Sequence, residues 1–182
     1  MKKFLLSTLI ISTLLSCSDS TVSVNSLTDK GSEAESLHEN SKIDHHSRSN
    51  FEDVRTKHIH LDLSVDFDKQ RISGVARHSI ELIDKNVKEI IFDAKALQLD
   101  SITLGDKESE TKVDFTLSDN DELLGEALHV PINKESKQVN IYYSTTKDTE
   151  ALGWMSPENT DGKKHPFLFT QGQAILTRTW IP

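Results

Sequence analysis

Residues 154–174 read WMSPENTDGKKHPFLFTQGQA, and this stretch decides what kind of domain the chain forms. It follows neither helical nor strand periodicity. Four residues interrupt regular structure in it: Pro157, Gly162, Pro166 and Gly172. Strand-like segments lie on both sides, and an irregular segment of this length inside a compact domain is usually functional. We therefore expect a β domain that carries a long functional loop.

An alternating pattern before the loop predicts the first strand. Apolar residues occupy every second position: Ile59, Leu61, Leu63, Val65 and Phe67. A period of two is that of a strand with one buried face. We expect Asp68–Gln70 to form a turn, Arg71–Ile83 to form the second strand, and Gly74 to mark a bulge in it.

Further short segments also read as strands, separated by Asp, Asn, Gly or Lys. They are Glu89–Phe92, Leu97–Leu104, Lys112–Leu117, Ala127–Pro131, Gln138–Ser144 and Ala174–Ile181. No amphipathic helix is predicted after residue 17. Short strands joined by polar turns are typical of antiparallel β structure. The predicted fold class is all-β: an antiparallel, saddle-shaped sandwich of short strands, preceded by a disordered tether.

The N-terminus has the pattern of a secretory signal peptide. Lys2 and Lys3 precede an apolar run that ends in Leu14-Leu15-Ser16-Cys17, which resembles the lipobox of bacterial lipoproteins. Cys17 is the only cysteine. We expect residues 1–17 to be a lipoprotein signal peptide and Cys17 to carry a membrane-anchoring lipid in the bacterial cell envelope, on its periplasmic or surface side. The alternative is an ordinary signal peptide in which this cysteine occurs by chance.

Composition divides the rest of the chain. Residues 18–50 are polar and contain almost no large apolar side chain, so they predict a flexible tether. Residues 51–182 form the predicted β domain. The strand-like pattern runs to Pro182 without a turn, so we expect this domain to be truncated at its C-terminal end. The formal net charge of −8 argues against nucleic-acid binding, which requires a basic surface.

Histidines do not form a recognisable zinc motif in this sequence. His58 and His60 lie two apart on a predicted strand, without a nearby carboxylate or cysteine at ligand spacing, and we expect them on its solvent face. The motif H-E-x-x-H has no match, because Lys42 stands where the pair His38-Glu39 requires a second histidine. No G-x-S-x-G nucleophile elbow is present either.

The loop is similar to a segment of a known enzyme family. Residues 154–174 resemble W-x-x-P-E-x-T-x-G-K-x-H-P-[FY]-L-F-[ST]-Q-x-Q-A of zinc aminopeptidases of the leukotriene A-4 hydrolase type, which are related to aminopeptidase N. Residues 55–75 resemble the first two strands of the same enzymes, and Glu89–Ala94 resembles the third. The resemblance covers residues 55–182 and is weakest over residues 107–136. It implies the saddle-shaped N-terminal β domain, which a zinc domain and a helical domain follow in the family.

The resemblance also implies a binding role for the end of the loop. In the family, the Q-x-Q-A segment lines the subsite for the first residue of the substrate. The matching positions are Gln171, Gly172, Gln173 and Ala174. A glutamine amide can accept a hydrogen bond from an ammonium group and donate one to a carbonyl, and a glycine permits close approach. We expect three aromatic side chains to pack the loop onto the sandwich: Trp154, Phe167 and Phe169.

We therefore expect the N-terminal substrate-binding domain of a zinc metallo-aminopeptidase that removes N-terminal residues from peptides. Peptide substrates are the expected partners, and zinc is the expected cofactor of the complete enzyme. The chain lacks an identifiable catalytic residue or zinc site, so we expect it to bind no metal and to be inactive alone. The alternatives are a non-catalytic β-sandwich lipoprotein that binds peptide or glycan, and a structural envelope domain.

Overall fold

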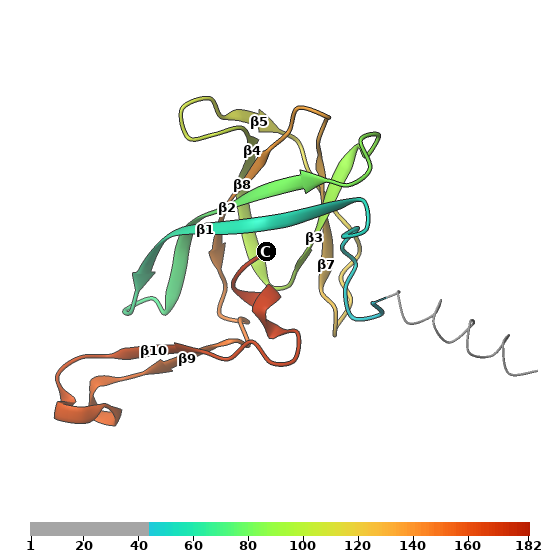
Figure 1. Ribbon diagram of the computed structural model, residues 1–182. Coiled ribbons are helices and arrows are strands. Elements are labelled where there is room, and N and C mark those ends of the chain that lie inside the picture. The colour runs from blue at the N-terminus through green and yellow to red at the C-terminus, as the bar shows by residue number, and fades with distance from the viewer. Residues whose placement is uncertain (1–43) are drawn as a thin grey trace, which may run out of the picture. The chain divides into compact units, whose positions relative to one another are not determined.

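Antiparallel strands dominate the part of the chain that the computed structural model describes, residues 44–182 (Figure 1). The strands are β1 (Val54–Asp66), β2 (Arg71–Leu82), β3 (Glu89–Ala94), β4 (Leu97–Leu104), β5 (Thr111–Val113), β6 (Thr116–Leu117), β7 (Glu126–Pro131), β8 (Gln138–Thr145), β9 (Leu152–Met155) and β10 (Phe167–Thr170). Three short 3-10 helices complete the structure: η1 (Pro157–Asn159), η2 (Asp161–Lys163) and η3 (Leu176–Thr179). The predicted all-β class is confirmed.

Two sheets pack face to face as a sandwich, and a separate ribbon extends from them. The larger sheet has the order β1-β2-β8-β4-β5, and the smaller has the order β3-β7-β6. All pairings are antiparallel, and β9 and β10 pair only with each other. The turn predicted at Asp68–Gln70 connects β1 and β2, as expected.

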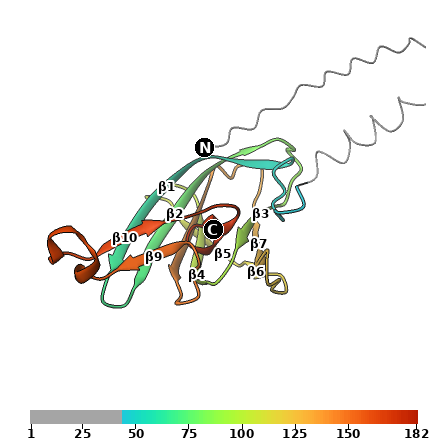
Figure 2. The ribbon, with the colours of Figure 1, turned by 90° about the horizontal axis from the view of Figure 1, so that it is seen from below.

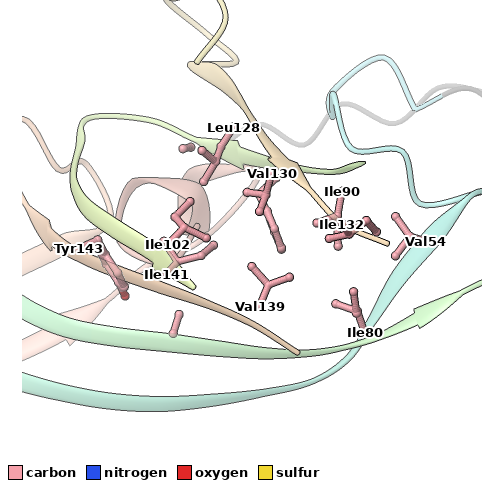
Figure 3. Packing of buried hydrophobic residues seen from close by; sticks show 13 residues of the cluster. Val54, Ile80, Ile90, Ile102, Leu128, Val130, Ile132, Val139, Ile141 and Tyr143 are labelled. Carbon is pink, nitrogen blue, oxygen red and sulfur yellow. The ribbon is translucent and has the colours of Figure 1, made fainter. Parts of the chain in front are cut away.

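The core lies between the two sheets and follows from strand alternation (Figure 3). In β8, Val139, Ile141 and Tyr143 are fully buried and point to one face. In β7, Leu128 and Val130 face them from the smaller sheet and are also fully buried. Burying such a side chain is worth about 1.5–3 kcal/mol, so this alternation supplies the main driving force for the fold.

Strand β1 is more exposed than its alternating pattern predicts. Leu61 and Leu63 pack against the core, but Ile59 and Val65 are 41% and 43% exposed, and Phe67, directly after the strand, is 39% exposed. The reason is position: β1 is an edge strand and runs past the smaller sheet together with β2 (Figures 1 and 2). Half of the apolar face of β1 therefore lacks a covering layer among the described residues.

Gly74 does not mark the predicted bulge. The β1–β2 register is continuous through Gly74, and the irregularity lies instead between Thr56 and His58. The glycine is required because the backbones approach closely. A Cβ atom at Gly74 would lie 2.2 Å from the carbonyl oxygen of Asp62, and the φ angle of Gly74 is +151°. Neither the contact nor the backbone angle suits an L side chain.

We expect Gly74→Ala to lower the free energy of unfolding by about 1–3 kcal/mol, because the added methyl group would push the β1 backbone away. Urea denaturation of the 182-residue chain measures this change. Gly162→Ala is the matched control, since it also has a positive φ of 70° but no atom within 4 Å of the added Cβ. An equal loss in both variants would contradict the steric explanation.

Two strand predictions are wrong in part. The predicted strand Lys112–Leu117 is divided between β5 in the larger sheet and β6 in the smaller one. The predicted strand Ala174–Ile181 contains η3 instead. Arg178 and Thr179 are neighbours and both are buried, whereas a strand would point adjacent side chains to opposite faces.

Several predictions for the N-terminal region lie outside the described residues. They concern the signal peptide, Cys17 and residues 18–43 of the predicted tether. Residues 44–50 are described and contact the domain: the Ser47 hydroxyl and the Arg48 backbone N–H both donate hydrogen bonds to the Asp93 carboxylate, over 2.6 and 2.9 Å. Within residues 44–182, no helix has the length and apolar character needed to cross a bilayer.

Candidate functional site

The loop predicted from residues 154–174 is largely a two-stranded ribbon. Strands β9 and β10 pair from Phe167 opposite Met155 to Thr170 opposite Leu152, and η1 and η2 form the tip. The ribbon projects away from both sheets (Figures 1 and 2). Phe167, Phe169 and Thr170 are of residue types enriched in strands. Gly153 leaves room for the Phe169 ring, which would lie 2.2 Å from a Cβ atom there.

The two faces of the ribbon differ in their contacts. On one face, the Trp154 ring packs edge-on against Phe67 at a centroid distance of 5.6 Å, so Trp154 holds the ribbon to the β1–β2 turn as expected. On the other face, Phe167 and Phe169 are 54% and 47% exposed. The prediction that these two phenylalanines pack onto the sandwich is therefore wrong, because their strand alternation turns them away from β1.

The predicted binding segment, residues 171–174, directly follows β10. The Gln171 backbone N–H donates to the carbonyl of Ala151 over 2.8 Å and extends the ribbon by one residue. The Gln171 side-chain oxygen accepts a hydrogen bond from the Gln173 backbone N–H at 3.1 Å. Gln171, Gln173 and Ala174 are exposed, and the peptide bond between Gln173 and Ala174 is cis. The structure thus presents both amide side chains to the surface.

The chain folds back on itself at Gly172. A Cβ atom at Gly172 would lie 2.2 Å from the Thr177 hydroxyl oxygen. The Gly172 carbonyl also accepts a hydrogen bond from the Leu176 backbone N–H over 2.9 Å. The loop from Gly172 to η3 is therefore tight, and a Cβ atom at position 172 would require the exposed Thr177 side chain to move.

Buried polar contacts fix the segment that follows the loop. The Thr179 hydroxyl accepts a hydrogen bond from the Ala151 backbone N–H at 3.2 Å and donates to the Leu176 carbonyl at 2.8 Å. The Tyr143 hydroxyl donates to the Trp180 carbonyl at 2.7 Å, and burial raises the pKa of this phenol above its ordinary value. A neutral Tyr143 hydroxyl thus stays a donor at all ordinary pH values. These contacts hold η3 against the core and fix both ends of residues 171–174.

A second anchor centres on the Arg178 guanidinium, which is 8% exposed. It donates hydrogen bonds to three backbone carbonyls: Ile175 at 3.0 Å, Leu124 at 2.9 Å and His46 at 2.6 Å. It also pairs with the Asp93 carboxylate at 3.3 Å. No sequence motif predicts this network. The one available signal was a charged residue within the otherwise apolar, strand-like segment 174–182.

The arrangement is suited to binding. Residues 171–174 offer neutral donors and acceptors but no acid, base or nucleophile. His58 and His60 are exposed on β1, as predicted. Across the described residues, 44–182, no three His, Cys, Asp or Glu side chains gather into a group that could hold a metal ion.

Comparison with known proteins shows a consistent similarity. Residues 55–182 match the family model of the peptidase M1 N-terminal domain. The chain is 34% identical over 143 residues to leucine aminopeptidase 2-2 of Scheffersomyces stipitis, covering 78% of this chain and 22% of that protein. It is 36% identical over 146 residues to a leukotriene A-4 hydrolase homolog of Botryotinia fuckeliana, covering 76% of this chain and 22% of that protein.

Solved structures agree with the sequence matches. Native leukotriene A4 hydrolase from Saccharomyces cerevisiae is similar with a TM-score of 0.70 and 28% sequence identity, covering 81% of this chain and 24% of that chain. A complex of the yeast LTA4 hydrolase with bestatin is similar with a TM-score of 0.67 and 30% sequence identity, covering 77% of this chain and 22% of that chain. The chain spans about a fifth of the length of the curated relatives it matches.

The predicted localisation is contradicted by these comparisons. We expected a lipid-anchored protein of the bacterial cell envelope, but the similar proteins are aminopeptidases and a leukotriene A-4 hydrolase homolog from fungi. The prediction depended on the signal-peptide pattern and lipobox of residues 1–17, outside the matched region. So short a motif carries much less information than similarity over more than 140 residues.

Proposed function

We propose, from the premise that this chain belongs to the peptidase M1 N-terminal domain family, that it forms the substrate-binding N-terminal domain of a zinc aminopeptidase. The complete enzyme would remove N-terminal residues from peptides. In this proposal, residues 171–174 bind the amino end of the peptide, while a separate catalytic domain cleaves it. The proposal rests chiefly on the exposed Gln171 and Gln173 amides, which lie at the base of the ribbon, between β10 and the buried anchor of η3.

The position of these amides supports a role in binding. A ligand-facing side chain must be exposed, and its backbone must be fixed so that little order is lost on binding. Residues 171–174 meet both conditions, because β10 precedes them and η3 follows them with Arg178 and Thr179 buried. An exposed amide on a mobile loop would meet only the first condition.

Hydrogen-bond chemistry suggests how the two glutamines divide the task. The Gln171 oxygen already accepts from the Gln173 backbone N–H, so Gln171 helps to shape the loop. No internal hydrogen bond engages the Gln173 side chain within the described residues, so its oxygen can accept from a substrate ammonium group and its NH2 group can donate to a carbonyl. We therefore assign the direct contact to Gln173 and a positioning role to Gln171.

Zinc fits the complete enzyme of this proposal, and residues 44–182 offer no site for it. Catalytic zinc needs three protein ligands and one open position. Residues 44–182 contain no matching group of His, Cys, Asp or Glu side chains. The contribution that we propose for this domain is to hold the peptide, and the chemical step belongs to the catalytic domain.

We expect Gln173→Ala to reduce catalytic efficiency roughly 10- to 150-fold, because a hydrogen bond to a charged group is worth about 1.5–3 kcal/mol. A chimaera supplies the catalytic domain: residues 55–182 replace the aligned segment of Saccharomyces cerevisiae leukotriene A4 hydrolase. Aminopeptidase kinetics measure the effect, and inhibition by bestatin gives a second readout of the same cleft. The melting temperature should barely change, since the Gln173 side chain is exposed.

Asn120→Ala is the matched control, because Asn120 is an exposed amide in the β6–β7 connection, outside the ribbon and residues 171–174. It should leave both the kinetics and the melting temperature unchanged. Normal kinetics for Gln173→Ala together with a large fall in its melting temperature would show that Gln173 is structural. The assignment of residues 171–174 to a substrate subsite would then be abandoned.

A further inference from the structure

A recess of about 300 Å³ lies where the β1–β2 turn meets the end of β8. It is lined by Lys69, Gln70, Arg71, Thr145, Thr146 and Lys147. The antiparallel register places these segments together, because the first residues of β2 pair with the last residues of β8. Three of the six lining residues are cationic and none is acidic. Such a composition is unexpected in a chain with 29 acidic and 21 basic residues.

The Arg71 guanidinium is held in place by neutral groups. Its Nη2 donates to the Gln98 side-chain oxygen at 2.8 Å, and its Nε donates to the Thr145 carbonyl at 3.4 Å. Among the ion pairs of residues 44–182, none joins Arg71 to a carboxylate within 4.0 Å. A half-buried guanidinium that is oriented but not neutralised is preorganised for an external anion.

The two lysines differ in their availability. The Lys69 ammonium pairs with the Asp66 carboxylate at 3.0 Å, and the backbone N–H and ammonium of Lys69 hold the pKa of Asp66 below its ordinary value. Asp66 therefore neutralises Lys69. Lys147 is exposed and forms no ion pair with any residue in the described part of the chain. Arg71 and Lys147 together leave two positive charges at the recess.

We propose that this recess binds a phosphate-type dianion, either inorganic phosphate or the phosphoryl group of a small monoester. The two uncompensated positive charges match the charge of a dianion better than they match the single negative charge of a carboxylate. The guanidinium can bind two phosphate oxygens through its fork, while the ammonium acts as a point charge. Bound phosphate would link the β1–β2 turn to the end of β8. Because Phe67 in that turn packs against Trp154, the ligand would also steady the base of the β9–β10 ribbon.

Titration of the 182-residue chain with inorganic phosphate, at constant ionic strength set by sodium chloride, tests the proposal. We expect saturable amide shifts in NMR spectra at residues 69–71 and 145–147, with a dissociation constant on the order of 1 mM at low salt and weaker binding as salt rises. Glycerol phosphate distinguishes the two sources. If glycerol phosphate and inorganic phosphate bind with equal affinity, the recess recognises the phosphoryl group alone. If glycerol phosphate binds more tightly, the recess recognises a monoester.

Lys147→Gln should weaken phosphate binding by about tenfold or more, and Arg71→Gln should do the same. Lys134→Gln is the control, because Lys134 is an exposed lysine in the β7–β8 turn and its replacement changes the net charge equally. Since Lys147 is exposed, its variant should fold normally even if the Arg71 variant does not. The proposal is overturned if the amide shifts do not saturate at a phosphate concentration 20-fold above the expected dissociation constant. It is also overturned if acetate binds as tightly as phosphate, or if Lys134→Gln weakens phosphate binding as much as Lys147→Gln does.

Discussion

Replacing Arg178 by alanine is expected to lower the free energy of unfolding by about 3–5 kcal/mol, because it breaks a buried ion pair and removes several hydrogen bonds at once. The guanidinium contacts segments that are distant in sequence, through the carbonyls of His46 and Leu124 and the carboxylate of Asp93. Its loss leaves three carbonyls without their donor and a carboxylate that is only 16% exposed with one partner fewer. Domains have total stabilities of about 5–15 kcal/mol, so this change is a large fraction.

Thermal and urea denaturation of the 182-residue chain measure this effect, and a fall in melting temperature on the order of 10 °C is expected. Arg178→Lys should recover only part of the loss, since an ammonium group cannot reproduce the planar fork that reaches three carbonyls. Arg55→Ala is the control. Its guanidinium pairs with Glu52 at 3.7 Å at an exposed position, and an exposed pair contributes about 0–1 kcal/mol. A comparable loss in both variants would show that the Arg178 network is not an anchor.

Acidification is expected to destabilise the domain through His78. The side chain is 2% exposed, its Nε2 has no hydrogen-bond partner, and its ring packs against Phe92 at a centroid distance of 4.7 Å. Its other ring nitrogen lies 3.4 Å from the Thr56 hydroxyl. Burial lowers the pKa of His78 from 6.5 to about 4, because the charged imidazolium would be desolvated in the core.

The sign of the pH dependence follows from proton uptake. Between pH 6.5 and pH 4 the unfolded chain binds a proton at His78 and the folded chain does not, so stability is complete above pH 6.5 and falls as the pH drops toward 4. The full difference is about 3 kcal/mol, of which about 2 kcal/mol is lost between pH 7 and pH 5. Urea denaturation at both pH values measures it.

His78→Leu should reduce this pH dependence, because leucine fills the apolar site without titrating. His60→Gln is the control, since His60 is exposed on β1 and its replacement should leave the pH dependence unchanged. If the His78→Leu chain lost as much stability between pH 7 and pH 5 as the unaltered chain, the buried histidine would not be the source. A group elsewhere in the domain would then have to be responsible.

The features that were predictable from the sequence are those encoded by neighbouring residues. Alternation located β1, β2 and β8, and the polar residues Asp68–Gln70 located the turn between the first two. The loop motif identified residues 171–174 as the candidate binding segment, and the structure exposes both of their glutamines. The role of that segment in substrate binding stays a prediction until Gln173 is tested.

Other features depend on contacts between residues that are far apart in the chain. Periodicity could not assign residues 112–117 to two different sheets, because both halves have the local character of a strand. It could not show that half of the apolar face of β1 is left uncovered, since coverage depends on the extent of the opposite sheet.

The sequence by itself determined the all-β class, the positions of most strands and the motif that the ribbon carries, because these follow from local alternation and from short residue patterns. Long-range contacts, in contrast, make residues 176–179 the helical turn η3 where a strand was predicted over residues 174–181. Burial of the Arg178 charge is favourable only where Asp93 and the carbonyls of His46, Leu124 and Ile175 converge on it. That convergence is a property of the folded chain, and no local pattern records it.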